Sequence, residues 1–221
     1  TDQEPTPEPR IDDDLSADVR RIAARQTQWS SLLQPFSAQI AVAVRVDSPP
    51  RLDGRLDESF WNTTYAKPAE TRDRRPVQLQ FCWDDQFVYI AVRSPVGFLQ
   101  SDGTSEDVGR RDADLTQSDR IAVGFDIDRD LLSAMKIGFT RDGRTHDDLD
   151  GFDNWNPTWY VATHQSDDGA TAEIAIEQNS LAVTLQEGDN WFVEAQAIAS
   201  GEPRRYRMMP DPLTRVRVDF R

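Results

Sequence analysis

The sequence has a single cysteine, Cys82, so an intrachain disulfide is excluded. Hydrophobic residues make up 38% of the chain, which is below the usual level for a globular domain. No stretch approaches the roughly 20 apolar residues of a membrane helix, so we expect no membrane span. The lack of disulfides leaves a periplasmic or extracellular location open, because 221 residues can bury a sizeable core without them.

Basic residues are also few. Lys and Arg number 25 against 39 Asp and Glu, which gives a formal net charge of −14. A chain this acidic repels phosphates, so nucleic acid is excluded as a partner. An acidic surface suits Ca²⁺ or uncharged partners such as sugars, or it serves only to keep the protein in solution.

The first 36 residues differ in composition from the rest. Residues 1–14 are rich in proline and aspartate and predict a polar tail. Asp14 or Ser16 can cap a helix that runs to about Leu33 with one apolar stripe. We therefore predict a polar tail plus helix over residues 1–36 and a second domain over residues 37–221. Because the chain begins at Thr1, we expect a trimmed form of an exported protein, part of a larger polypeptide.

Apolar residues alternate with polar ones through the second domain, which is the period of half-buried strands. The pattern predicts about nine strands and one short helix at Asp57–Trp61. The strands are Ile40–Val46, Val77–Trp83, Val88–Val92, Ile121–Ile127, Met135–Phe139, a strand from Trp159 through Thr163, Ala172–Ile176, Trp191–Ala199 and Val216–Phe220. Two long loops, Ser94–Ser118 and Arg144–Pro157, separate them. The fold class is thus all-β, a two-sheet antiparallel β-sandwich of the immunoglobulin or jelly-roll kind with a short N-terminal helix.

Four segments in order carry a family resemblance. Leu52–Trp61 reads LDGRLDESFW and resembles the D-G-x-L-D-E-x-x-W opening of family 9 carbohydrate-binding modules. Val77–Val92 is similar to the family's first hairpin, Asp119–Asp128 to its acidic central strand, and Ala172–Ile176 to its A-E-I-A-I strand. The resemblance covers roughly Val46–Ala199.

The resemblance implies a β-sandwich that binds carbohydrate in an exported bacterial protein, and it implies structural calcium. The sequence departs from the family pattern at Ala170-Thr171, where Gly-Trp is frequent, and at Glu177, where Pro is frequent. Distant relatives of the same sandwich bind haem.

The segment Asp153–Trp159 combines aromatic and amide side chains. An aromatic ring covers the apolar face of a sugar, and amides bond its hydroxyls. Trp155, flanked by Asn154 and Asn156 in a loop, is the expected exposed platform, and Trp159 begins a strand and can face either way. The alternative is that both tryptophans belong to the core.

A charged loop supplies further candidates. Arg111, Asp112 and Asp114 mix donors and acceptors, and the resemblance places this loop beside the family's binding face. We expect these three side chains to bond sugar hydroxyls. The alternative is a solvated charged loop.

Four carboxylates crowd the second long loop. Asp147, Asp148, Asp150 and Asp153 surround a glycine turn, and Ca²⁺ takes six to eight oxygen ligands. We predict a structural calcium ion there and no other cofactor.

No catalytic motif is present: there is no phosphate loop, no Ser-His-Asp arrangement and no H-E-x-x-H sequence. The sequence therefore predicts a non-enzyme, and the resemblance implies a carbohydrate-binding module that would use aromatic stacking and loop hydrogen bonds. A structural or adhesive sandwich without a small ligand is the alternative, and a haem-binding domain is a third.

Overall fold

The computed structural model describes residues 39–62, 77–94, 99, 108–129, 135–149, 152–166, 169–201 and 215–221. All of these belong to one compact unit, Ala38–Arg221. The tail and helix expected within residues 1–36 lie outside the described residues, so the domain boundary stays a prediction. No helix in the described part of the chain is long and apolar enough to cross a membrane.

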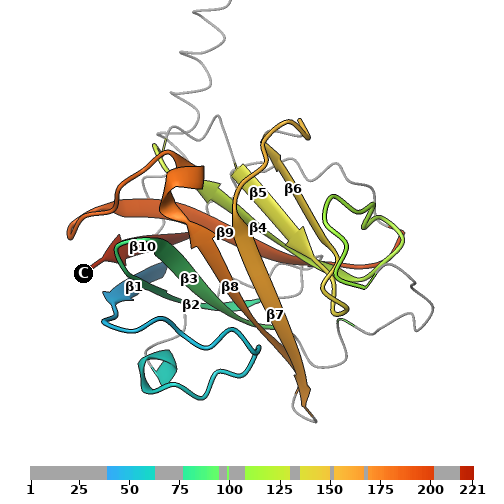
Figure 1. Ribbon diagram of the computed structural model, residues 1–221, viewed down its shortest axis with the longest axis horizontal. Helices are drawn as coiled ribbons and strands as arrows, with labels where there is room; N and C mark the ends of the chain where they lie inside the picture. The colour runs from blue at the N-terminus through green and yellow to red at the C-terminus, as the bar shows by residue number, and fades with distance from the viewer. Residues whose placement is uncertain are drawn as a thin grey trace, which may run out of the picture. The chain divides into compact units, whose positions relative to one another are not determined.

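The described residues form strands joined by turns and two short 3-10 helices (Figure 1). In chain order the elements are β1 Gln39–Arg45, η1 Ser59–Asn62, β2 Gln78–Trp83, β3 Phe87–Arg93, β4 Arg120–Asp126, β5 Met135–Phe139, β6 Thr145–Leu149, β7 Trp159–Ser166, β8 Gly169–Glu177, η2 Gln178–Leu181, β9 Asn190–Ile198 and β10 Arg215–Phe220. Each strand predicted from the sequence is present, and the short helix expected at Asp57–Trp61 is η1.

The loop predicted at Arg144–Pro157 was partly wrong, because its first part is β6. This strand reads THDDL, and its inward side chains are Thr145 and Asp147. A strand whose buried face is polar lacks the apolar alternation on which the prediction depended.

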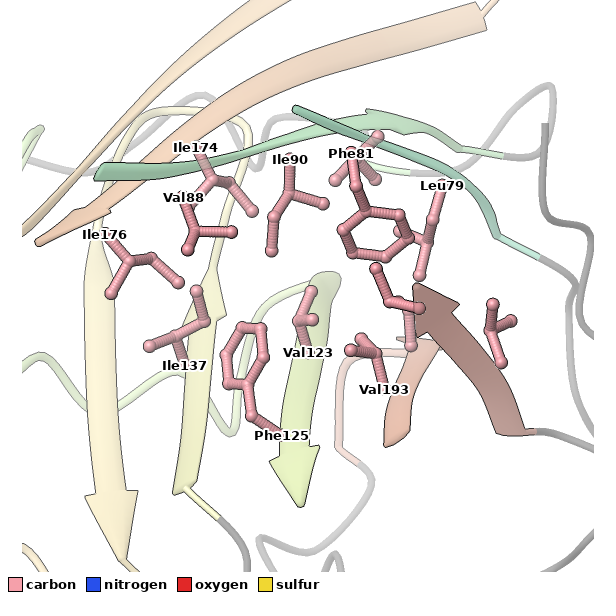
Figure 2. Packing of buried hydrophobic residues seen from close by; sticks show 14 of the residues in the cluster. Leu79, Phe81, Val88, Ile90, Val123, Phe125, Ile137, Ile174, Ile176 and Val193 are labelled. Atoms are coloured by element: carbon pink, nitrogen blue, oxygen red, sulfur yellow. The ribbon is translucent and has the colours of Figure 1, made fainter. Parts of the chain in front are cut away.

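All the strands belong to one sheet in the order β6-β5-β4-β9-β10-β1-β2-β3-β8-β7. The pairs β1–β10 and β1–β2 are parallel, and the other pairs are antiparallel. The sheet curls so that β1, β2, β3, β8 and β7, the first layer, face β10, β9, β4, β5 and β6, the second layer (Figures 1 and 2). The predicted all-β, two-layer sandwich is confirmed.

The core lies between the two layers. Figure 2 shows Val88 and Ile174 of the first layer pointing toward Val123 and Ile137 of the second. These side chains are almost fully buried and come from alternate strand positions, as the period-two pattern requires. Burial of such a continuous apolar layer is the main force that holds the two halves of the sheet together.

The first layer is covered on its outer face as well. Trp61, Cys82, Tyr89 and Ala175 form a second cluster there, packed by side chains of the segment 46–62. Burial raises the pKa of the Cys82 thiol well above its usual range, so Cys82 is an inert packing residue. A sheet covered on both faces explains why β2 and β3 are buried along nearly their whole length.

The Leu52–Trp61 motif fastens this covering segment to the sheet. Glu173 of β8 is fully buried, and its Oε2 accepts hydrogen bonds from the backbone N–H groups of Asp53 and Gly54, both at 3.0 Å. Its Oε1 accepts from Trp61 Nε1 at 2.9 Å. Burial raises the pKa of Glu173, and the three donors offset only part of that effect. The motif residues therefore act together on one carboxylate.

Glycine is required at position 54. Its φ of +79° lies in the left-handed region, and a Cβ there would approach the carbonyl carbon of Thr163 to 2.5 Å. The backbone of the motif thus lies directly against β7.

Candidate functional site

Trp159 does not provide an exposed ring. It begins β7, its side chain is 4% exposed within the core, and its Nε1 donates to Asp147 Oδ1 at 2.9 Å. This bond joins the two terminal strands of the sheet, β6 and β7, across the sandwich. We therefore correct the expectation that Trp159 serves as a stacking platform, because a sugar cannot reach either face of a buried ring.

Trp155 is only partly accessible. It is half-buried against the core, and its Nε1 donates to the carbonyl oxygen of Ser180 at 3.2 Å. The Ser180 hydroxyl oxygen accepts a bond from the N–H of Thr158 at 2.8 Å. Both bonds tie the β6–β7 loop, described over residues 152–158, to η2, so this loop is held in place rather than free.

The structure brings Arg111, Asn156 and Asp147 together. One Arg111 guanidinium nitrogen donates to Asn156 Oδ1 at 3.1 Å and to the carbonyl oxygen of Pro157 at 2.9 Å. The same nitrogen lies 3.6 Å from Asp147 Oδ1. Burial and the nearby Asp112 carboxylate raise the pKa of Asp147, whereas the Trp159 hydrogen bond and Arg111 oppose that rise.

Two other sequence candidates, Asp114 and Asn154, lie in the loops that flank this group. Asp114 Oδ1 accepts from the backbone N–H and the hydroxyl of Thr116, at 3.0 and 2.8 Å, and so closes its own turn. Asn154 is exposed in the β6–β7 loop, two residues before Asn156.

Two of the four acidic residues expected to bind calcium, Asp147 and Asp148, point in different directions. Asp147 and Asp148 are neighbours in β6, so their side chains lie on opposite faces of the sheet. Asp148 lies 3.7 Å from Lys136 Nζ, and Asp153 lies 3.6 Å from His146 Nε2. Asp150 lies outside the described residues, and among the described ones no group of three or more acidic, His or Cys side chains could hold a metal. Calcium binding stays a prediction.

The outer face of the second layer carries polar side chains that the sequence analysis missed. The register places Asp148, Lys136, Gly124 and Glu194 in one row across β6, β5, β4 and β9. The neighbouring row is His146, Gly138, Ala122 and Gln196. We call these eight residues the polar face. The signal was present in the strands as the residues that alternate with the apolar ones, to which the sequence analysis assigned no role.

Ionisable side chains on the polar face are unusually buried. Lys136 and Glu194 are both less than a tenth exposed, and Gln196 Nε2 donates to Glu194 Oε1 at 3.1 Å. Charged residues are seldom so buried unless they are paired or serve a function. Two glycines and an alanine between them keep the middle of this face low in side-chain bulk.

The β6–β7 loop reaches the edge of the polar face. Asp153 contacts His146, which belongs to that face, and the preceding Phe152 is 69% exposed. Phe152 also pairs with Leu149 at the end of β6, which fixes its backbone. An exposed aromatic residue is therefore followed in this loop by exposed residues that carry carboxylate and amide groups, and the sequence analysis overlooked it in favour of the tryptophans.

Comparison with known proteins gives structural neighbours only. No protein-family model matches the sequence, and no curated protein matches it. A family 9 carbohydrate-binding module from Caldicellulosiruptor kristjanssonii in complex with cellotriose is 16% identical, with a TM-score of 0.56 over 83% of this chain and 94% of that one. A structure of such a module from the same organism with glucose is 17% identical, with a TM-score of 0.56 over 81% and 95% of the two chains. A provisionally assigned carbohydrate-binding protein from Bacteroides uniformis is 7% identical, with a TM-score of 0.58 over 84% and 100%.

These likenesses extend over nearly the full length of the neighbours. At this level of identity they establish the fold and leave the ligand to be argued from the site. The chain has the β-sandwich fold of family 9 carbohydrate-binding modules.

Proposed function

We propose that this chain is a non-catalytic carbohydrate-binding module of an exported bacterial protein. Two of its structural neighbours are family 9 modules in complex with cellotriose and with glucose, and this chain spans more than nine tenths of each. The observation that carries the proposal to this chain is the β6–β7 loop, where exposed Phe152 is followed by Asp153, Asn154 and Asn156.

This loop offers the two kinds of contact that a sugar requires. The Phe152 ring covers the C–H face of a pyranose, and the neighbouring carboxylate and amides bond its hydroxyls. Arg111 holds the Asn156 amide through a 3.1 Å hydrogen bond and so limits its rotation. A loop that is already ordered before the sugar binds loses less conformational entropy on binding.

The charge of the protein restricts the class of sugar. A net charge of −14 and the exposed Asp153 disfavour uronic acids and sulfated glycans. Neutral oligosaccharides are the expected ligands, with affinity that depends little on salt.

The test is calorimetric titration of the full chain with soluble neutral oligosaccharides, including cellotriose. The variant Phe152→Ala should weaken binding about tenfold, the scale of one lost aromatic contact. Ile40→Ala is the matched control, because Ile40 is also a large exposed apolar residue, 60% accessible, and lies on β1 outside this loop. The control should bind as the unaltered protein does.

Two results would overturn the proposal at different levels. A folded protein that binds no member of a broad glycan panel would remove carbohydrate binding altogether. Binding that is unchanged in Phe152→Ala would retain the function but move the site away from the β6–β7 loop.

A further inference from the structure

Strand β7 ends the sheet and presents an open edge. It pairs only with β8 among the described residues. The N–H of Glu177 donates to the carbonyl oxygen of Thr158, so Tyr160, Ala162 and His164 direct their backbone groups toward β8 by the alternation of an antiparallel ladder. The N–H and C=O groups of Val161 and Thr163, which lie between them, therefore point to the open edge.

The composition of this edge is unusual. β7 is eight residues long and contains no Asp, Glu, Lys, Arg or Pro, in a chain in which 29% of residues are charged. Proteins normally protect edge strands with charges, proline or short length, because an open edge can pair with another strand. β7 also carries Tyr160, one of the few large apolar side chains more than half exposed.

The opposite edge shows what protection looks like in the same protein. β6 has five residues and includes Asp147 and Asp148. Its open side is occupied at Thr145, whose N–H donates to the carbonyl of Arg110 and whose carbonyl accepts from the N–H of Ala113, both at 2.9 Å. Only β7, among the two terminal strands, combines length and absence of charge with backbone groups at Val161 and Thr163 that point to the open edge.

We propose that β7 is a self-association edge, at which a second copy of this chain adds its own β7 in antiparallel orientation. Two copies that each carry a charge of −14 repel one another, and contact along an uncharged strand brings the fewest like charges together. Antiparallel pairing of a strand with itself gives a two-fold symmetric, closed dimer with one continuous sheet.

The pairing register follows from the side-chain faces. Outward residues must meet outward residues, and the register that pairs the two open-edge residues Val161 and Thr163 with each other places Ala162 opposite Ala162 of the second copy. Tyr160 then lies opposite His164 of the second copy, and the open-edge groups of Val161 bond those of Thr163 of the second copy. The two Ala162 side chains therefore lie at the two-fold axis, and one pair of Tyr160 and His164 side chains lies on each side of it.

Two double variants of the full chain test this register by sedimentation velocity from low micromolar to submillimolar concentration. The unaltered protein should form a dimer. Tyr160→Lys/His164→Lys places like charges opposite each other twice and should raise the dissociation constant at least about tenfold. Tyr160→Lys/His164→Glu alters the same two positions but places opposite charges there, and it should restore the dimer. Within one copy the two positions are four residues apart on an extended strand, so the charges do not pair internally.

Each alternative outcome contradicts the inference. An unaltered protein that stays monomeric throughout the concentration range removes the dimer, and a dimer unaffected by the two lysines places the interface elsewhere. Equal loss in both double variants, with circular dichroism showing both folded, refutes the register. Hydrogen exchange gives a test without substitution, because the amides of Val161 and Thr163 should exchange more slowly as concentration rises, and exchange independent of concentration would contradict pairing at β7.

Discussion

Replacing Glu173 should destabilise the protein more than any other single carboxylate change on β8, because three donors depend on it. Glu173 is fully buried, and it accepts bonds from the N–H groups of Asp53 and Gly54 and from Trp61 Nε1. A buried donor left without an acceptor costs about 1–3 kcal/mol. Because the whole segment 46–62 is attached to the sheet at this point, we expect the loss to appear in the free energy of global unfolding.

The magnitude differs between two substitutions. In Glu173→Gln the remaining carbonyl oxygen can still accept from Asp53 and Gly54, and the new NH₂ group then faces Trp61 Nε1. One donor is lost, so we expect the free energy of unfolding to fall by about 1–3 kcal/mol. Glu173→Ala leaves all three donors unpaired and opens a cavity, so the loss should reach at least about 3 kcal/mol.

Urea denaturation followed by circular dichroism and tryptophan fluorescence measures both losses. Glu177→Gln is the matched control, because Glu177 lies on the same strand and the same face but is only partly buried, with a 3.5 Å bond from Ser180. The control should change the free energy of unfolding by less than about 0.5 kcal/mol. A Glu173→Gln variant as stable as this control would refute the reasoning that the carboxylate fastens the segment.

Two further predictions concern turns. Burial alone would raise the pKa of Asp142, but bonds from Thr140 and Arg144 outweigh it and hold the pKa below its ordinary value. Asp142→Asn should therefore lower the free energy of unfolding by about 1–2 kcal/mol at neutral pH. In urea melts this difference should vanish as the pH falls through the depressed pKa, because the wild-type carboxylate is then protonated. A difference in the free energy of unfolding that does not change with pH would contradict this prediction. Gly54→Ala should lower the melting temperature more than Gly188→Ala does. Both glycines have a positive φ, but only a Cβ at position 54 would meet backbone atoms, at 2.5 Å. Equal falls in melting temperature would show that the backbone near Gly54 can move to make room.

The strands could be predicted because the two layers are held together by apolar residues at every second position. Leu79 and Phe81 of β2, for example, are both buried in the core, as their alternation indicated. The parallel pairing of β1 with β10 and with β2 could not be predicted, since it joins segments far apart in sequence and leaves no local pattern. β6 escaped notice because its buried positions are Thr145 and Asp147.

The site was harder to predict because side-chain direction depends on the strand assignment. Because β6 is a strand, Asp147 points inward to Trp159 and Asp148 points outward to Lys136. These two carboxylates therefore do not converge, although their closeness in the sequence suggested shared metal ligands. Trp159 shares its face with Val161, and that alternation favoured burial over exposure. The association of Arg111 with Asn156 joins two loops 45 residues apart, and no sequence pattern reports it.

The residues that reveal the fold and the residues that would contact a ligand are different sets. Asp53, Gly54 and Trp61 are all engaged in holding the covering segment against Glu173 on the outer face of the first layer. Their presence therefore predicts the sandwich and says little about what it binds. Under the proposed function, the ligand is decided where Phe152 and the following polar side chains leave β6. Sequences with this motif can consequently share the sandwich while differing in ligand, and substitutions in the loop should change binding without changing stability, whereas substitutions in the motif should do the reverse.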